Sequence, residues 1–174
     1  MTSSEMAELN EAVNLIERLV PDSRGGLPDT LFFLMSRLTP MVNVDLLISN
    51  EKNEKLVTWR ADKFYGPGWH LPGGIIRFKE KAHERVLKVA QLELDAFIEF
   101  DPLPILVDEL MNPERDVRGH FISMVFKCRL KSDLDPKRRA QSVLTAENGQ
   151  WTWVGSMPSN MIKQQLRFEF LFNG

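Results

Sequence analysis

A pair of glycines and one glutamate are the residues whose spacing best suits a chemical role. Gly73 and Gly74 close the segment 69–74, and Glu93 lies on a helix predicted over residues 79–94. At 100° per residue, Glu93 falls within about 40° of three apolar side chains on that helix, Ala82, Val86 and Val89. A carboxylate on the covered face of a helix is costly unless a cation, a hydrogen bond or an ion pair compensates it.

Two interpretations of Glu93 are open on this pattern alone. A glycine pair lets backbone groups approach a ligand closely, and carboxylate and carbonyl oxygens are the ligands that Mg²⁺ and Mn²⁺ prefer. Such a cation would in turn indicate a phosphate-containing substrate. The structural interpretation is that Glu93 pairs with an arginine or is capped by backbone groups.

Composition limits the classes of protein to which the chain can belong. It has 174 residues, of which 43% are hydrophobic and 26% charged, as expected for one globular domain. A net charge of −2 gives no electrostatic sign of a nucleic-acid or membrane-surface binder. Cys128 is the single cysteine, no apolar run approaches the ~18 residues of a membrane span, and no signal peptide is recognisable. We therefore expect a cytoplasmic protein that binds neither nucleic acid nor membranes.

Helices and strands alternate along the chain. A Thr2–Glu5 capping box and an apolar stripe predict a first helix that ends at Pro21, and a second helix follows over residues 31–38. We interpret residues 1–38 as an N-terminal helical arm and residues 39–174 as one domain. Strands are predicted at 42–49, 55–60, 69–71, 97–100, 105–110, 121–130 and 151–154.

Three further expectations concern the connections. The strands at 42–49 and 55–60 are expected to form a hairpin, and Ser159 is expected to cap a closing helix over residues 159–170. The basic run at 137–139 is expected to be a solvated loop. Phe64 and Tyr65 follow the second strand, where they could pack against the fold or stack on a base. Strands between helices favour a mixed sheet covered on both faces.

The spacing of Gly74, Glu80 and Glu93 resembles the Nudix signature, G-x5-E-x7-R-E-U-x-E-E-x-G-U, in which U is bulky and aliphatic. Four positions depart from it, namely Lys88, Val89, Leu92 and Asp95. The GDP-mannose mannosyl hydrolase branch departs in a similar way, and the resemblance to that branch covers segments 39–45, 56–60, 69–74, 151–154 and 164–170. It implies an α/β Nudix fold, an α/β/α sandwich with a mixed β-sheet, plus the N-terminal arm.

The resemblance also implies a metal-dependent reaction. One cation, Mg²⁺ or Mn²⁺, would be held by Gly73, Glu93 and Glu147. It would neutralise the diphosphate of a nucleoside diphosphate sugar, such as GDP-mannose or GDP-glucose, while water attacks the sugar carbon and releases the free sugar. Arg60 would support the leaving diphosphate, for which a planar, permanently charged guanidinium is suited.

The same resemblance assigns the other site residues. Asp45 matches an acidic residue of the substrate site, and Arg77 could replace a family arginine whose position is occupied by Ile75. His120 could line the site. Asn148 stands where the family has its general-base histidine, and an amide does not take up a proton at neutral pH.

Several alternatives therefore remain. Glu147 could act as the base, or the metal could activate water unaided. The chain could be a conventional Nudix pyrophosphohydrolase that cleaves a P–O–P bond, or a nucleotide-sugar-binding protein that hydrolyses its ligand poorly. The resemblance further implies a homodimer in which the N-terminal helices form a dimer arm.

Overall fold

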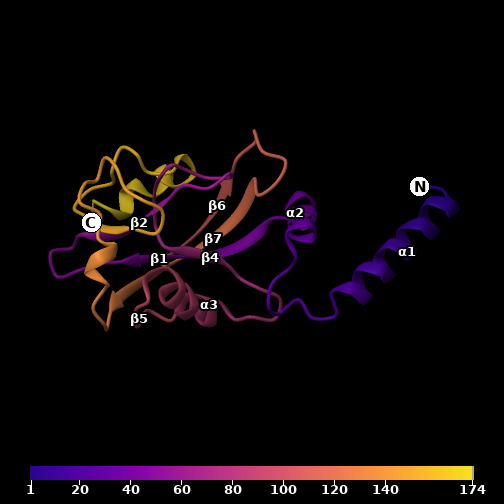
Figure 1. Ribbon diagram of the computed structural model, residues 1–174, viewed down its shortest axis with the longest axis horizontal. Coiled ribbons are helices and arrows are strands. Elements are labelled where there is room, and N and C mark those ends of the chain that lie inside the picture. Colours follow the sequence, from indigo (N-terminus) through magenta and orange to yellow (C-terminus); the bar gives the residue numbers. More distant parts are fainter. Residues whose placement is uncertain (174) are drawn as a thin grey trace.

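Two β-sheets form the centre of the computed structural model, which describes residues 1–173 (Figure 1). Gly174, the last residue of the expected domain 39–174, lies outside the described residues. The larger sheet has the order β4-β1-β7-β5, and β6 also pairs with β7. Its strands are β1 (Met41–Ile48), β4 (Gly73–Ile75), β5 (Ile98–Phe100), β6 (Leu106–Met111) and β7 (His120–Leu130). The smaller sheet has the order β3-β2-β8, formed by β2 (Lys55–Arg60), β3 (Gly68–His70) and β8 (Trp151–Val154).

The larger sheet is mixed, as predicted. β1 and β7 run parallel, with Met41 opposite Phe121 and Ile48 opposite Cys128. β4 pairs antiparallel with β1. β5 and β6 pair antiparallel with different parts of β7. β1 therefore lies between two neighbours and connects the glycine segment of β4 to the centre of the fold.

The predicted hairpin between β1 and β2 is wrong. A single bridge from Ser49 to Lys55 joins them, next to a turn in which Asn50 Oδ1 accepts the N–H groups of Lys52 and Glu54. Both edges of β1 are already occupied by β4 and β7. β2 therefore leaves the turn to pair with β3 and β8 in the smaller sheet.

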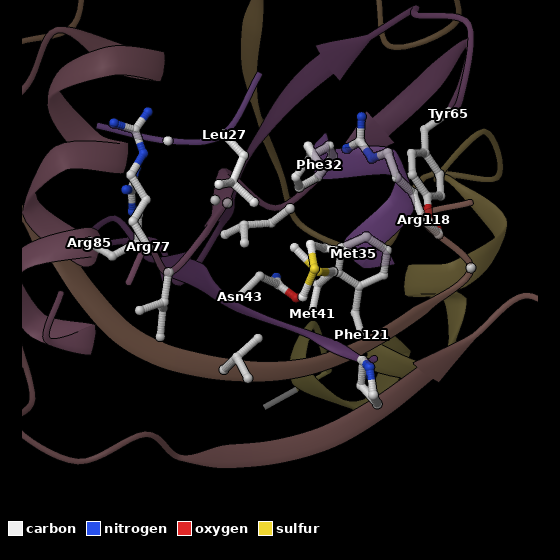
Figure 2. Close-up of a pocket in the computed structure, with 18 of the residues that line it drawn as sticks. Leu27, Phe32, Met35, Met41, Asn43, Tyr65, Arg77, Arg85, Arg118 and Phe121 are labelled. Carbon is white, nitrogen blue, oxygen red and sulfur yellow. Dashed lines mark hydrogen bonds between the residues drawn. The ribbon is translucent and has the colours of Figure 1, made fainter. Parts of the chain in front are cut away.

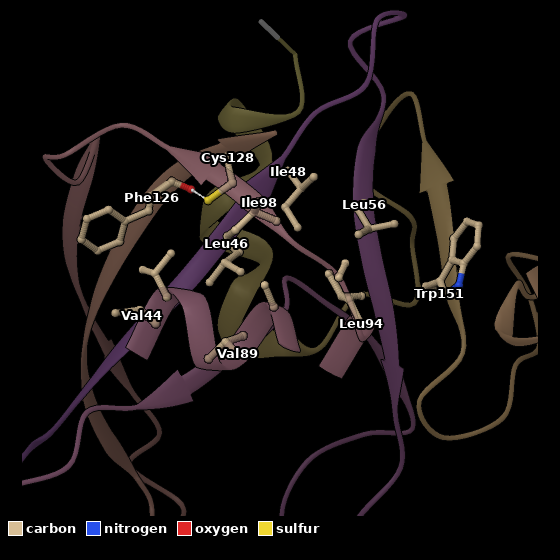
Figure 3. Close-up of a cluster of buried hydrophobic side chains, with 13 residues drawn as sticks. Val44, Leu46, Ile48, Leu56, Val89, Leu94, Ile98, Phe126, Cys128 and Trp151 are labelled. Atoms are coloured by element: carbon tan, nitrogen blue, oxygen red, sulfur yellow. Dashed lines mark hydrogen bonds between the residues drawn. The ribbon is translucent and has the colours of Figure 1, made fainter. Parts of the chain in front are cut away.

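Alternate side chains of β1 face the two sides of the larger sheet. Val44, Leu46 and Ile48 pack under helix α3 (Ala82–Val89) in the cluster shown in Figure 3. Leu47 faces the other way, into a second cluster that includes Phe168 of helix η3 (Lys163–Leu171). Helices on opposite faces of the sheet confirm the predicted sandwich of mixed α/β class.

The middle helix is shorter and less regular than predicted. Lys79 has a φ of 58°, a left-handed conformation that a helix cannot include, and α3 begins only at Ala82. The last turn of the expected helix is a π-helical turn, η1 (Ala90–Leu94). π-Helical turns are rare and frequently occur at functional sites.

The closing helix also differs from the prediction. η3 is a 3₁₀ helix that starts at Lys163, so Ser159 does not cap it. Trp69 of β3 donates its N–H to the carbonyl of Asn160 and accepts the N–H of Ile162. The backbone before Lys163 is therefore used in sheet-like pairing and cannot also form a helical turn.

Two helices precede the sheets, and the first is largely uncovered. α1 (Ser3–Leu19) begins with the predicted Thr2–Glu5 capping box, and α2 covers Asp29–Leu38. α1 projects away from the sheets (Figure 1), and no α1 residue is buried by the chain between residues 1 and 173. Leu9 and Val13 are 48% and 44% exposed. Across residues 1–173, no helix combines the length and apolarity needed to cross a bilayer.

Replacing Leu46 with alanine should lower the free energy of unfolding by about 2–5 kcal/mol, because the side chain is fully buried and its loss leaves a cavity under α3. Leu144→Ala is the matched control, since Leu144 is 78% exposed, and it should change that energy by less than about 0.5 kcal/mol. Urea unfolding followed by tryptophan fluorescence measures both variants. Equal losses would contradict the placement of Leu46 in the core.

Candidate functional site

Glu93 points inward from the π-helical turn η1, as the helical pattern predicts. Its Oε1 accepts the N–H of Gly73 at 3.3 Å, and its Oε2 accepts the hydroxyl of Thr58 at 3.3 Å. Both hydrogen bonds are long, and Glu93 forms no ion pair with any residue from 1 to 173. Of the two structural alternatives, an arginine partner is not observed, since Arg138 donates to the backbone carbonyl of Glu93 and not to its carboxylate. The other, a backbone group, is present as the long hydrogen bond from the Gly73 N–H.

No basic side chain among residues 1–173 forms an ion pair with the Glu93 carboxylate. Burial raises the pKa of the Glu93 carboxyl to about 7, and the Asp45 carboxylate acts in the same direction. The Gly73 N–H, the charge of Arg60 and the Thr58 hydroxyl oppose this shift without cancelling it. A divalent cation at this point would favour the ionised carboxylate.

Thr58 contacts the Glu93 carboxylate, and His70 lies next to Thr58. His70 Nδ1 lies 2.7 Å from the carbonyl oxygen of Leu71, so Nδ1 carries a proton, and Nε2 lies 3.2 Å from Thr58 Oγ1. Burial lowers the pKa of His70 to about 4, so the ring is neutral at physiological pH. The sequence analysis missed Thr58, although a hydroxyl within the otherwise apolar run 56–59 was a signal that could have found it.

Asp45 lies beneath the glycine segment and is 2% exposed. Its carboxylate accepts hydrogen bonds from Asn43, Ser123 and Gln165, and burial raises its pKa to about 6 despite them. A Cβ at Gly73 would lie 2.5 Å from Asp45 Oδ1. Asp45 therefore joins β1, β7 and η3 under the site, a position that corrects its expected contact with substrate.

A cavity of about 1590 Å³ lies between the glycine segment and the N-terminal helices (Figure 2). Glu93, Gly73, Arg60 and Asn148 line it together. Its other walls are apolar and come mainly from α1, α2 and the start of β1, including Leu9, Val13, Phe32, Met35 and Met41. The fold thus brings these four sequence-predicted site residues, and also Arg77, to one cavity.

Arg60 and Asn148 are held by specific hydrogen bonds. Arg60 Nε donates to Asp62 Oδ2 at 2.5 Å, which fixes the guanidinium at the end of β2. Asn148 Oδ1 accepts the N–H of Ala61 at 3.0 Å. The Asn148 side chain therefore fixes the backbone directly after Arg60.

Arg138 connects the late loop to the π-helical turn. Its guanidinium donates to the carbonyl oxygens of Gly149 and Glu93. Lys137 and Arg139 are exposed, as the expected solvated loop requires, but Arg138 is partly buried and lines the cavity. The solvated-loop expectation is therefore wrong for Arg138.

Of the other three residues expected in the site, Glu147 and His120 lie outside the cavity lining and Arg77 lies within it. Glu147 is exposed in a turn closed by Gln150 and is not among the lining residues, so this placement does not make it a metal ligand or a base. His120 Nε2 lies 2.7 Å from Glu109 Oε1 on β6, also outside the cavity lining. Arg77 does line the cavity (Figure 2), and a Cβ added at Gly26 in the α1–α2 connection would lie 3.5 Å from its guanidinium carbon.

The side chains around Glu93 supply only part of a metal centre. No three His, Cys, Asp or Glu side chains within residues 1–173 form a ready-made metal centre. Mg²⁺, however, is often held by one or two carboxylates together with substrate phosphates. Glu93 fits that arrangement, because its carboxylate has only long hydrogen bonds and lies against the backbone of Gly73.

Solved structures establish the fold. A MutT protein from Methanosarcina mazei Go1 matches with a TM-score of 0.56 and 21% identity, over 78% of this chain and 92% of that one. A MutT NUDIX hydrolase from Burkholderia pseudomallei matches with a TM-score of 0.56 and 15% identity, over 78% and 97%. A UDP-X diphosphatase matches over 99% of this chain and 83% of its own, with a TM-score of 0.55 and 15% identity. The chain has the Nudix fold.

No protein-family model and no curated protein matches the sequence itself.

The two glutamates of the signature-like segment, Glu80 and Glu93, differ in their ion-pair partners. Glu80 pairs with Arg85 at 2.6 Å and Lys88 at 2.8 Å. Burial acts to raise the pKa of Glu80, but these partners and the N–H of Arg77 lower it to about 2. Glu80 therefore stabilises the start of α3, whereas Glu93 is left available for a ligand.

The free energy of unfolding should fall as pH rises from about 4 to about 6, because native Asp45 holds its proton more tightly than the unfolded chain does. A raised native pKa gives stability that is complete below the unfolded value near 3.8 and lost as pH passes about 6. Its contribution is roughly 3 kcal/mol. Asp45→Asn should flatten this slope in urea unfolding curves recorded across the range.

Asp133→Asn is the control, since Asp133 is exposed, and it should keep the slope of the unmodified protein. Glu93 adds to the decline in the same direction up to about pH 7 and is unaltered in both variants. An unchanged slope in Asp45→Asn would contradict the assigned electrostatics of the buried carboxylate.

Proposed function

We propose that this protein is a Mg²⁺-dependent Nudix hydrolase that acts on a nucleoside diphosphate sugar, of the GDP-mannose or GDP-glucose type, and releases the nucleoside diphosphate and the free sugar. The observation that carries the proposal is the inward carboxylate of Glu93, which has no ion-pair partner within the described chain and faces the same cavity as Arg60. A carboxylate for a cation beside a fixed guanidinium is an arrangement suited to a diphosphate.

Each of the site residues has a separate role in the proposed reaction. Glu93 and the backbone of Gly73 would hold one Mg²⁺ or Mn²⁺, which supplies positive charge against the departing diphosphate. Arg60, fixed by Asp62, presents its guanidinium to the same group. Asn148 keeps the end of β2 in place. The bond between the sugar carbon and the diphosphate oxygen breaks, and the electron pair stays on the diphosphate. Water supplies the new hydroxyl group, and its other proton passes to solvent.

A single available carboxylate supports cleavage at the sugar carbon. Attack of water on phosphorus is commonly assisted by two metal ions that stabilise both the attacking and the leaving oxygens. Residues 1–173 offer no cluster of three acidic or histidine ligands for such a centre. Stabilising a leaving diphosphate requires only that its negative charge be neutralised, which one cation and Arg60 would provide.

Cleavage of the P–O–P bond is the second candidate. It is favoured by the match to a UDP-X diphosphatase, which extends over 99% of this chain and so includes the N-terminal helices. In that case the products would be a nucleoside monophosphate and a sugar phosphate. The substrate class and the cavity would be the same, so the products distinguish the two candidates.

Purified protein with Mg²⁺ should convert GDP-mannose or GDP-glucose to GDP and free sugar, separated by anion-exchange chromatography. Glu93→Gln should lower the rate at least ~100-fold, because it removes the charged ligand of the cation. UDP-glucose and ADP-ribose complete the substrate panel.

Glu99→Gln is the matched control, since Glu99 lies on β5 and pairs with Lys131 at the surface. It should retain full activity. Monophosphate and sugar phosphate as products would establish the second candidate, no product from the panel would favour a binding protein, and full activity in Glu93→Gln would contradict the site.

We further propose that the protein is a homodimer in which α1 packs on a second copy of the chain. The apolar face of α1, with Leu9 and Val13, is uncovered in the single chain and lines the same cavity as the site. The partner's α1 would therefore bury an exposed apolar stripe and narrow the cavity mouth at once.

Light scattering after gel filtration should give twice the monomer mass of 20.1 kDa. Changing both Leu9 and Val13 to aspartate should produce a monomer, because two charges would enter the buried stripe. Glu11→Lys changes charge on the opposite side of the helix and should leave the dimer intact. A monomeric unmodified protein would contradict the arrangement.

A further inference from the structure

Arg118 is a partly buried cation that the fold supplies with no anionic partner. It lies just before β7, and its backbone N–H donates to Ser36 Oγ of α2 at 3.1 Å. Its guanidinium forms no hydrogen bond or ion pair with any residue between 1 and 173, and its Nε is buried without an acceptor. Most buried polar atoms in native proteins have a hydrogen-bond partner, so the Arg118 Nε without an acceptor needs an explanation.

The guanidinium belongs to a cluster of like charges. The central carbons of Arg60, Arg115 and Arg118 lie 5.2, 4.7 and 5.5 Å from the centre of the Tyr65 ring. The one carboxylate in ion-pair contact with the three is Asp62, among the described residues, and it is taken by Arg60. Arginine groups this close repel one another, and burial together with Arg60 lowers the pKa of Arg118. The cluster therefore carries unneutralised positive charge.

The orientation of Arg118 favours an anion over a stacked base. Its central carbon lies 4.8 Å from the centre of the Phe64 ring, 5.8 Å from that of Phe32 and 5.5 Å from that of Tyr65, so three aromatic rings already surround the guanidinium. Hydrogen bonds are made at the edge of a guanidinium, where its N–H groups suit phosphate or carboxylate oxygens. Arg118 lines the cavity, on the side away from Arg77 in Figure 2.

We propose that Arg118 forms a second anion subsite, which binds an oxyanion of the ligand in addition to the diphosphate. The inference rests on the proposed function, because the diphosphate is placed at Glu93 and Arg60. Arg60 and one divalent cation oppose the diphosphate there, and Arg60 has Asp62 as its own counterion, whereas Arg118 has none among residues 1–173. The positive charge of Arg118 is then left for a further group, either an additional phosphate on the nucleotide or a carboxylate on the sugar.

Calorimetric titration of the full-length protein tests this subsite, with Ca²⁺ in place of Mg²⁺ to limit turnover. The phosphate arm compares GTP with GDP and UTP with UDP, and the carboxylate arm compares UDP-glucuronate with UDP-glucose. The protein should bind the more anionic member of at least one pair about tenfold more tightly, as expected for a hydrogen-bonded charge pair. If the phosphate pairs show the tighter binding, the oxyanion is a phosphate; if the UDP-glucuronate pair shows it, the oxyanion is a carboxylate.

Arg118→Gln should reduce this affinity ratio to about one, and Arg118→Lys should retain part of it, since lysine keeps the charge but not the fork. Arg129→Gln is the matched control, an exposed arginine farther along β7, and should keep the full ratio. No preference in either arm, or a full preference in a folded Arg118→Gln protein, would overturn the inference.

The outcome is separable from the proposed function. Full activity of Glu93→Gln would overturn that function, whereas the affinity ratio and its loss in Arg118→Gln do not depend on turnover. Unfolding curves of the Arg118 variants show whether a lost ratio comes from the subsite or from a damaged fold.

Discussion

Strand β4 runs so close to its neighbours that two of its positions accommodate only glycine. A Cβ at Gly73 would meet the Asp45 carboxylate at 2.5 Å, and one at Gly74 would meet Val89 of α3 at 2.8 Å. This packing brings the backbone of Gly73 against the Glu93 carboxylate and fixes α3 over β1. The site depends on it, because a wider spacing would move Glu93 away from the glycine segment and open the core beneath it.

The carboxylates near this contact differ in their ion pairing and in the direction of their pKa shifts. Glu80 is paired with two cations and has a lowered pKa, as a structural ion pair should. Asp45 is buried and Glu93 is half-buried, and neither has an ion-pair partner among residues 1–173. Both have raised pKa values, so their ionisation at neutral pH lowers the stability of the fold. Asp45 is compensated by three hydrogen bonds, whereas Glu93 has two long ones and faces the cavity. Glu93 is thus the carboxylate that a bound cation would stabilise most.

The sequence patterns correctly predicted features that depend on residues close together in the chain. Periodicity placed Glu93 on the covered face, and the capping box fixed the start of α1. Long-range pairing was not predictable in this way, because the parallel partner of β1 is β7, more than seventy residues later. That pairing is why the expected hairpin does not form. It also determines the location of His120 at the start of β7, away from the cavity, and of Arg118 beside Tyr65.

In the proposed function, Glu93 is the side chain that binds one divalent cation. Titration with Mn²⁺, followed by electron paramagnetic resonance in the presence and absence of GDP, tests this role without relying on turnover. We expect one Mn²⁺ per chain, bound more tightly with the diphosphate present and lost in Glu93→Gln. Mn²⁺ binding that is absent from the unmodified protein, or that persists unchanged in Glu93→Gln, would contradict it.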